Sequence, residues 1–260
     1  MVKRLFCILL LLAPFLFAAE SKDLAFRAEK AMQAGKFARS NSLYERALLS
    51  SRKEADLSSE GRILIAMATL RTQSLDFKFA EGLLGQVRKE SLDTNSLAAL
   101  NLARMELFNG QEKFPETIRV WNSLSKRFLD HVTDPLRGNL LCAAAVAFAA
   151  KGDRESAMDL LEDADDYLDD DAPGKLAFAA ARVEHLLGGS SADSLYGVAL
   201  KYSISSGRPY MSATILYYRG LCSKRSSIAE DYFVRSANAF DLMGLTRNKE
   251  RSGSHIKKKN

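Results

Sequence analysis

The sequence is poor in the residues from which catalytic and metal-binding sites are usually built. Its 260 residues include three cysteines, three histidines, five prolines and one tryptophan. None of the histidines, His131, His185 and His255, belongs to an HExxH motif or a CxxC pair, which are common zinc-binding patterns. The sequence also has no GxSxG, GxGxxG or GxxxxGKS/T segment. These absences predict that the protein is not an enzyme and binds no cofactor or metal.

Strand signals are scarce as well. The chain has few β-branched runs and lacks the alternation of apolar and polar residues that a half-buried sheet requires. Hydrophobic residues make up 47% of the chain, which is enough for a continuous core. With so few prolines to interrupt them, these residues favour an all-helical protein.

The apolar run at the N-terminus is too short to span a bilayer. It extends over 15 residues, from Leu5 to Ala19, whereas a spanning helix needs about 20. Two basic residues precede the run and two small residues end it, as in a secretory signal peptide. We therefore expect residues 1–19 to be a signal peptide and the protein to be periplasmic or secreted. Phe17 stands where the cleavage site prefers a small residue, so a membrane anchor formed by an uncleaved N-terminus is the alternative.

The positive charge is concentrated at the two ends of the chain. The formal net charge is +5, of which residues 247–260 alone contribute a net +5 and the first four residues contribute two basic groups. The remainder therefore carries a net charge of −2, which predicts no nucleic-acid-binding face. Residues 247–260 are expected to form a basic disordered tail. Through Lys257, Lys258 and Lys259, this tail is a candidate contact with an anionic membrane or cell-wall polymer.

A helical hairpin is clearest between residues 141 and 164. Large and small apolar residues recur there at helical spacing around one central glycine. The residues are Leu141, Ala144, Ala145 and Phe148, then Gly152, then Ala157, Leu161 and Ala164. This pattern resembles a tetratricopeptide repeat.

Weaker copies of the hairpin precede and follow it. The six copies lie at about 21–54, 61–94, 96–129, 138–171, 173–206 and 213–246. Their starts are 35 to 42 residues apart, compared with 34 in the family. Gly35 and Gly188-Gly189 mark the turns of the first and fifth copies. In the third copy we interpret Asn109-Gly110 as the turn, followed by two extra residues.

The resemblance implies an all-α solenoid over residues 20–246, in which about six helix-turn-helix hairpins form a right-handed superhelix. A different α-solenoid, or two three-hairpin subdomains divided near residues 130–135, fits the same periodicity. Two repeats separate Cys142 from Cys222. Stacked hairpins would hold these cysteines farther apart than the ~7 Å Cα separation that a disulfide allows, so both are expected to be free.

The resemblance also implies a protein–protein interaction scaffold that binds a partner protein or peptide in a concave groove lined by the first helices. The predicted partner-binding residues mix aromatic, aliphatic and charged groups: Arg62, Gln73, Leu100, Arg104, Phe108, Glu184, His185 and Tyr217. Some relatives hold a C-terminal carboxylate with lysine and asparagine, but Ala25 and Glu29 stand at the matching positions here. The alternative function is an envelope-tethering module that binds through its basic tail.

Overall fold

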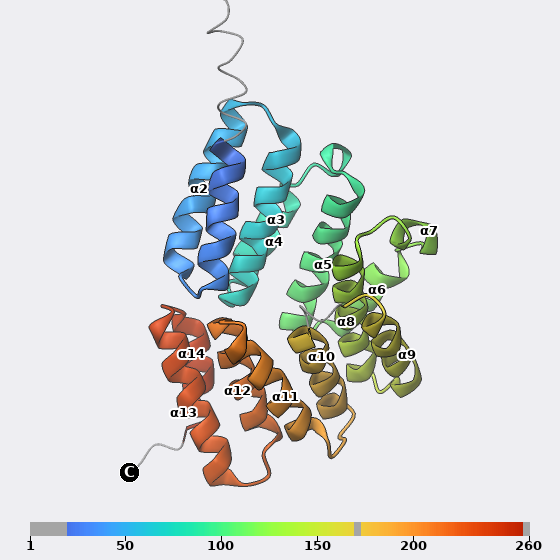
Figure 1. Cartoon of the computed structure of the whole chain (residues 1–260), viewed down its shortest axis with the longest axis vertical. Helices are drawn as coiled ribbons and strands as arrows, with labels where there is room; N and C mark the ends of the chain where they lie inside the picture. Colours follow the sequence, from blue (N-terminus) through green and yellow to red (C-terminus); the bar gives the residue numbers. More distant parts are fainter. Residues whose placement is uncertain (1–19, 169–172, 257–260) are drawn as a thin grey trace, which may run out of the picture.

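The hairpins follow one another around a closed arc. The structure is a computed structural model that describes residues 20–168 and 173–256, and these residues contain helices and turns but no strand. The N-terminal hairpins and the C-terminal hairpin lie one above the other on the left of Figure 1, and the middle hairpins connect them on the right. The expected signal peptide and Lys257–Lys259 lie outside the described residues.

Six helix pairs make up the array. The first pairs a helix over residues 20–33 with α2 (Phe37–Lys53). The others pair α3 (Leu57–Gln73) with α4 (Phe77–Gly85), α5 (Thr94–Gly110) with α6 (Phe114–Asn122), α8 (Asp134–Ala150) with α9 (Arg154–Asp165), α10 (Pro173–Leu186) with α11 (Ala192–Ser205) and α12 (Pro209–Cys222) with α13 (Ser226–Leu242). Two short helices, η1 (Lys89–Ser91) and α7 (Lys126–Leu129), lie between hairpins, and α14 (Thr246–Gly253) follows the sixth pair. The predicted all-α solenoid of six hairpins is confirmed.

One turn geometry recurs at eight helix junctions. Its middle residue has a φ between 54° and 79°, and the residues in this position are Gly35, Ala55, Leu75, Glu112, Gly152, Gly188, Gly207 and Gly244. The N–H of the next residue donates to the carbonyl five residues earlier, as Lys36 does to Ala31 at 2.8 Å. This geometry ends a helix and satisfies a carbonyl that the helix leaves free. The same turn therefore sets the register of successive hairpins.

This turn corrects the predicted register of the third hairpin. The expected turn at Asn109-Gly110 lies inside α5, and the left-handed residue is Glu112 instead. No extra residues follow Gly110, so the true register of α5 differs by two positions from the predicted one. Gly110 serves close packing, because a Cβ there would lie 3.0 Å from the Phe77 ring.

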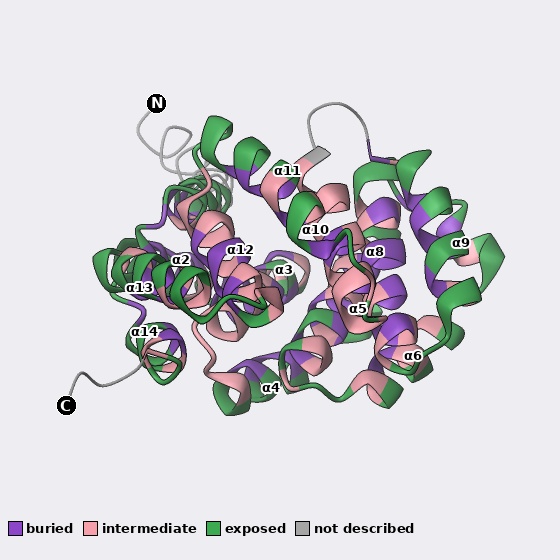
Figure 2. Cartoon of the chain, turned by 90° about the horizontal axis from the view of Figure 1, so that it is seen from below, coloured by how far each residue is buried: buried purple, intermediate pink, exposed green. Residues whose placement is uncertain are grey.

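Packing within each hairpin depends on buried faces that meet between the two helices. Seen from below, buried residues lie where paired helices touch, while exposed residues cover the outer side of α9 (Figure 2). Small polar residues also tie second helices to first helices. Ser40 Oγ donates to the Ala28 carbonyl at 2.8 Å, and Thr117 Oγ1 donates to the Met105 carbonyl at 3.3 Å. Cys142 and Cys222 are free thiols.

The two ends of the array share one hydrophobic core. Leu24 of the first helix belongs to the same buried cluster as Phe240 of α13 and Leu245. The rings of Phe37 on α2 and Tyr210 on α12 lie 5.6 Å apart between centroids. We call this junction the end-to-end contact, and it closes the superhelix into a ring.

The last helix forms part of the end-to-end contact. Asn248 Nδ2 donates to the Gln73 carbonyl at 3.0 Å, and Arg247 Nη1 donates to Asp76 Oδ1 at 2.9 Å. The prediction of disorder from residue 247 onward is therefore wrong for residues 247–256. The segment is polar, but Asn248 and Ser252 are fully buried and serve as packing groups.

Candidate functional site

The recurring turn identifies which side chains of the first helices face the centre of the ring. Residues six positions before the left-handed residue occupy equivalent places: Glu29, Thr69, Glu106, Val146 and Arg182. Lys175 and Phe178 lie on the same stripe of α10 as Arg182, at helical spacing. We call the surface formed by these stripes the concave face.

Two opposite charges on the concave face come from hairpins that are not neighbours. Burial lowers the pKa of Lys175 on α10, and the charges of Glu106 on α5 and of Glu29 on the first helix counteract this. Burial likewise raises the pKa of Glu106, and the charge of Lys175 opposes that change. The charges of side chains on three separate helices therefore act on one another.

The charges of Glu106 and Lys175 affect each other, but the two side chains form no ion pair or hydrogen bond with each other. Neither forms a hydrogen bond or an ion pair within 4.0 Å with any residue that the structure describes. The Glu106 side chain is accessible to water, yet the protein around it buries it enough to raise its pKa. Two partly desolvated charges therefore remain without close internal partners.

Aromatic and arginine side chains pack together in the C-terminal half of the ring. Arg182 Cζ lies 3.8 Å from the Tyr218 ring centroid, and Arg251 Cζ lies 4.2 Å from that of Tyr217. The two tyrosine rings are 5.3 Å apart, and Tyr218 also stacks with Tyr196 at 6.3 Å. We call Arg182, Tyr196, Tyr217, Tyr218 and Arg251 the arginine–tyrosine ladder. The ladder joins α10, α11, α12 and α14.

Several predicted contact residues of the third hairpin do not face the centre. Leu100 has no exposed surface and belongs to the core, which corrects its assignment as a partner contact. Arg104 precedes Glu106 by two residues, which places it about 200° around α5, on the opposite side. Phe108 is half-buried on that same side. The error has one cause, namely the two-residue shift introduced at Gly110.

The other predicted residues lie at the margins of the concave face or inside it. Arg62 pairs with Asp93 at 3.7 Å, and the Gln73 carbonyl belongs to the end-to-end contact. Glu184 accepts a hydrogen bond from Ser191 Oγ at 2.9 Å, next to the turn of the fifth hairpin.

Two predicted residues adjoin or belong to the ladder. His185 Nδ1 lies 3.2 Å from the Tyr196 hydroxyl, and burial lowers the pKa of this histidine. Tyr217 is buried within the ladder. The sequence analysis missed Glu106, Lys175 and Arg182, which counting back from Glu112 and Gly188 would have identified.

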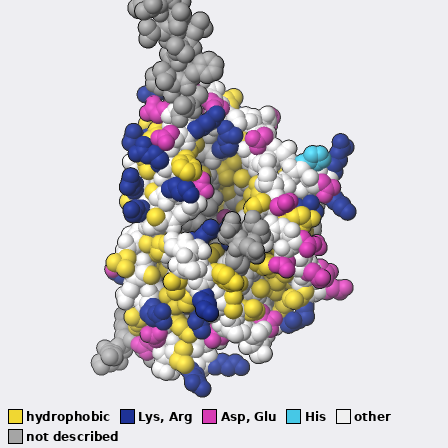
Figure 3. Space-filling view, viewed as in Figure 1, with side chains coloured by type: hydrophobic (Ala, Val, Ile, Leu, Met, Phe, Trp, Pro, Cys, Tyr) yellow, Lys and Arg dark blue, Asp and Glu magenta, His cyan; other side chains and the backbone are white. Residues whose placement is uncertain are grey.

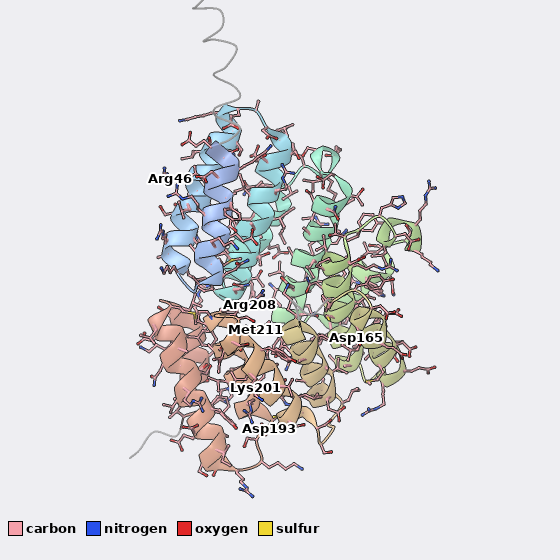
Figure 4. All side chains as sticks on the ribbon, viewed as in Figure 1. Arg46, Asp165, Asp193, Lys201, Arg208 and Met211 are labelled. Atoms are coloured by element: carbon pink, nitrogen blue, oxygen red, sulfur yellow. The ribbon has the colours of Figure 1, made fainter. Side chains whose placement is uncertain are left out.

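Of two cavities in the molecule, the one beside the concave face is small and the larger one lies along α4. A cavity of about 10 Å³ beside Lys175 holds one water at most. It is also lined by Arg208 and Met211 at the start of α12, which Figure 4 shows where the two halves of the ring meet. A cleft of about 320 Å³ runs along the second helix α4 and includes Phe79.

The outer surface carries charges of both signs. Lys and Arg side chains are numerous over the first hairpins, at the upper left of Figure 3, and several Asp and Glu side chains lie along the right edge. The exposed acidic residues of and beside α9 include Asp153, Glu155, Asp159, Glu162, Asp163, Asp165 and Asp166. Within residues 20–168 and 173–256, no group of three or more His, Cys, Asp or Glu side chains is placed to hold a metal ion.

A solved structure has the same fold. The chain is similar to the Signal Transduction ATPase with Numerous Domains (STAND) protein with a tetratricopeptide repeat sensor from Pyrococcus horikoshii, with a TM-score of 0.52 and 14% identity. The match covers 90% of this chain and 37% of that protein, so the chain spans little more than a third of its length. No protein-family model and no curated protein matches the sequence. The structural likeness, the six hairpins and their recurring turn show that the chain has a tetratricopeptide-like helical repeat fold.

Proposed function

We propose that this protein is a non-catalytic scaffold that binds a segment of a partner protein on its concave face. The observation that carries the proposal is that Glu106 and Lys175 have no ion-pair or hydrogen-bond partner among the described residues. A charge that is removed from water without a close partner reduces stability. A partner segment that supplies complementary groups would offset this cost when it binds.

The rest of the concave face fits the same role. Arg182 and Tyr218 are half-buried there, and Phe178 packs with Tyr218 at 5.9 Å between ring centroids. Arginine and tyrosine are enriched among the residues that contribute most to protein–protein binding. An extended or helical segment would contact several first helices at once, because each contributes one stripe.

Position-specific crosslinking tests this function with a control on the same helix. A photo-reactive phenylalanine replaces Glu106 in one variant and Arg104, on the opposite side of α5, in the other. Both full-length variants are expressed in the native cell and irradiated after circular dichroism has shown that they fold. We expect a defined protein adduct from position 106 and none from position 104. An adduct from position 104 alone, or from neither position, would refute the proposal.

We also propose that the protein is exported. The support is the sequence of residues 1–19, with its basic start and short apolar run. In the described part of the chain, no helix is long and apolar enough to cross a membrane. Mass spectrometry of the native protein should find a chain that begins at Ala19 or Glu20. A full-length chain in the cytoplasm would overturn the proposal.

A further inference from the structure

The described part of the chain contains four arginines that lie over a tyrosine ring. Arg137 lies over Tyr167 at 4.2 Å and Arg219 lies over Tyr232 at 4.6 Å. The other two are the arginines of the ladder, Arg182 and Arg251. The four distances are similar, so the remaining surroundings of each guanidinium can be compared directly.

An aspartate completes two of these stacks. Arg219 donates from Nε to Asp193 Oδ1 at 2.8 Å and from Nη2 to Asp193 Oδ2 at 3.1 Å. Arg137 donates from Nη1 to Asp130 Oδ1 at 3.3 Å. Stacking occupies the flat face of the guanidinium, whereas its N–H donors point outward in the plane. In both cases a carboxylate takes up donors at the edge.

Among the described residues, no carboxylate takes up donors of the two arginines of the ladder. No carboxylate of a described residue lies within 4.0 Å of Arg182 or Arg251. The charge of Glu112 acts on Arg182 from farther away, and the Tyr196 hydroxyl lies beside it. In addition, Arg251 Nε is buried and has no hydrogen-bond partner. A buried donor of this kind is costly unless something else satisfies it.

Carboxylates that accept hydrogen bonds from Arg182 and Arg251 can come from a segment bound on the concave face. We infer that the partner segment is acidic, and that Arg182 and Arg251 bind two of its carboxylates as Asp193 and Asp130 complete the other two stacks. This inference rests on the proposed function and specifies the chemistry of the partner. Arginine binds a carboxylate edge-on through two parallel N–H bonds, which fixes orientation as well as charge.

The ladder also restricts the spacing of the acidic residues. The path from Arg182 through Tyr218 and Tyr217 to Arg251 has steps of 3.8, 5.3 and 4.2 Å. The two guanidiniums are therefore no farther apart than the length of this path. In an extended segment, alternate residues point to one side about 7 Å apart, and every fourth residue lies about 13 Å away. The segment should thus carry Asp or Glu at alternate positions.

Synthetic peptides test the inference. Three fluorescein-labelled ten-residue peptides carry Glu, Gln or Lys at alternate positions and are otherwise identical. Fluorescence anisotropy measures their binding to the full-length protein at two salt concentrations. We expect the Glu peptide to bind, with an affinity that falls as salt rises, and the other two to bind at least tenfold more weakly. Equal binding of the Gln or Lys peptide, or no binding of the Glu peptide, would overturn the inference.

A pair of double variants locates the binding. Arg182→Gln with Arg251→Gln should weaken binding of the Glu peptide at least tenfold. The matched control, Arg104→Gln with Arg219→Gln, removes the same charge but leaves the ladder intact and should change binding less than twofold. Unchanged binding in the first variant, or equal losses in both, would show that the ladder is not the site.

If the first variant does not fold, Arg182→Lys keeps the charge without the planar edge and should weaken binding severalfold. Wild-type binding by that variant would refute the inference. A partner adduct from position 106 without Glu-peptide binding would leave the scaffold in place and reject only the acidic ligand.

Discussion

Replacing both Arg247 and Asn248 with alanine should loosen the end-to-end contact. Asn248 is fully buried, and its hydrogen bond to the Gln73 carbonyl is worth about 0.5–1.5 kcal/mol. The Arg247–Asp76 ion pair is largely exposed, with 58% and 29% of the two side chains accessible, so it adds about 0.2–1 kcal/mol. The double variant should therefore lose about 1–2.5 kcal/mol across the junction.

The hydrophobic core shared by the two ends should keep the ring closed despite this loss of stability. Phe37, Tyr210 and the buried cluster around them still join the two ends, so the ring should remain the major state. Opening should become more frequent, however, because about 1.4 kcal/mol corresponds to a factor of ten in population. Amide hydrogen exchange measures such openings directly.

The expected pattern is specific to the two sides of the junction. Peptides that cover α14 and residues 72–77 should exchange about tenfold faster or more, while those that cover α8 and α9 should not change. Lys249→Ala is the matched control, because Lys249 pairs with Asp241 at 2.9 Å within the C-terminal hairpin and not across the junction. Unchanged exchange over residues 72–77 in the double variant would show that these contacts do not hold the ring closed.

The sequence predicts the hairpins well where glycine stands at the recurring turn. Gly35 and Gly152 both have positive φ, and the registers assigned from them agree with the structure. A left-handed conformation costs a residue with a side chain only about 1–2 kcal/mol. The hydrogen bonds of the turn and the packing of the helices outweigh this cost at Leu75 and Glu112. Residue type alone therefore does not locate every turn.

This failure at one turn explains most of the errors in the predicted site. Taking Gly110 as the turn moved the assigned contacts of α5 from Leu102 and Glu106 to Leu100 and Arg104. The ladder was also beyond sequence reasoning, since Arg251 belongs to a segment whose polarity indicated disorder. A helix that buries polar rather than apolar groups has little hydrophobic signal.

Three further variants test the register, the turn and the concave face. Ala157→Leu should lower stability by about 1–3 kcal/mol in a thermal melt, because Ala157 and Ala145 are both fully buried in the fourth hairpin. An unchanged melting temperature would contradict that register. Glu112→Gly should raise stability by up to about 1 kcal/mol in a denaturant titration, since glycine adopts the left-handed conformation without a steric penalty. Gly152→Ala should lower stability for the same reason. Effects of the same sign in the two variants would show that Glu112 and Gly152 do not share one turn geometry. Glu106→Gln should stabilise the protein slightly at pH 7, by at most about 1 kcal/mol, because burial raises the pKa of Glu106 and its ionised form is the costly one, while solvent at this exposed side chain screens most of that cost. The folded-state pKa lies above the ordinary value of 4.5, so the cost is present above the folded-state pKa and disappears as the pH falls below 4.5. Denaturant titrations of both proteins should therefore converge in acid. A variant that is less stable at pH 7, or a difference that persists at pH 4, would mean that Glu106 is already compensated inside the ring and is not held ready for a partner.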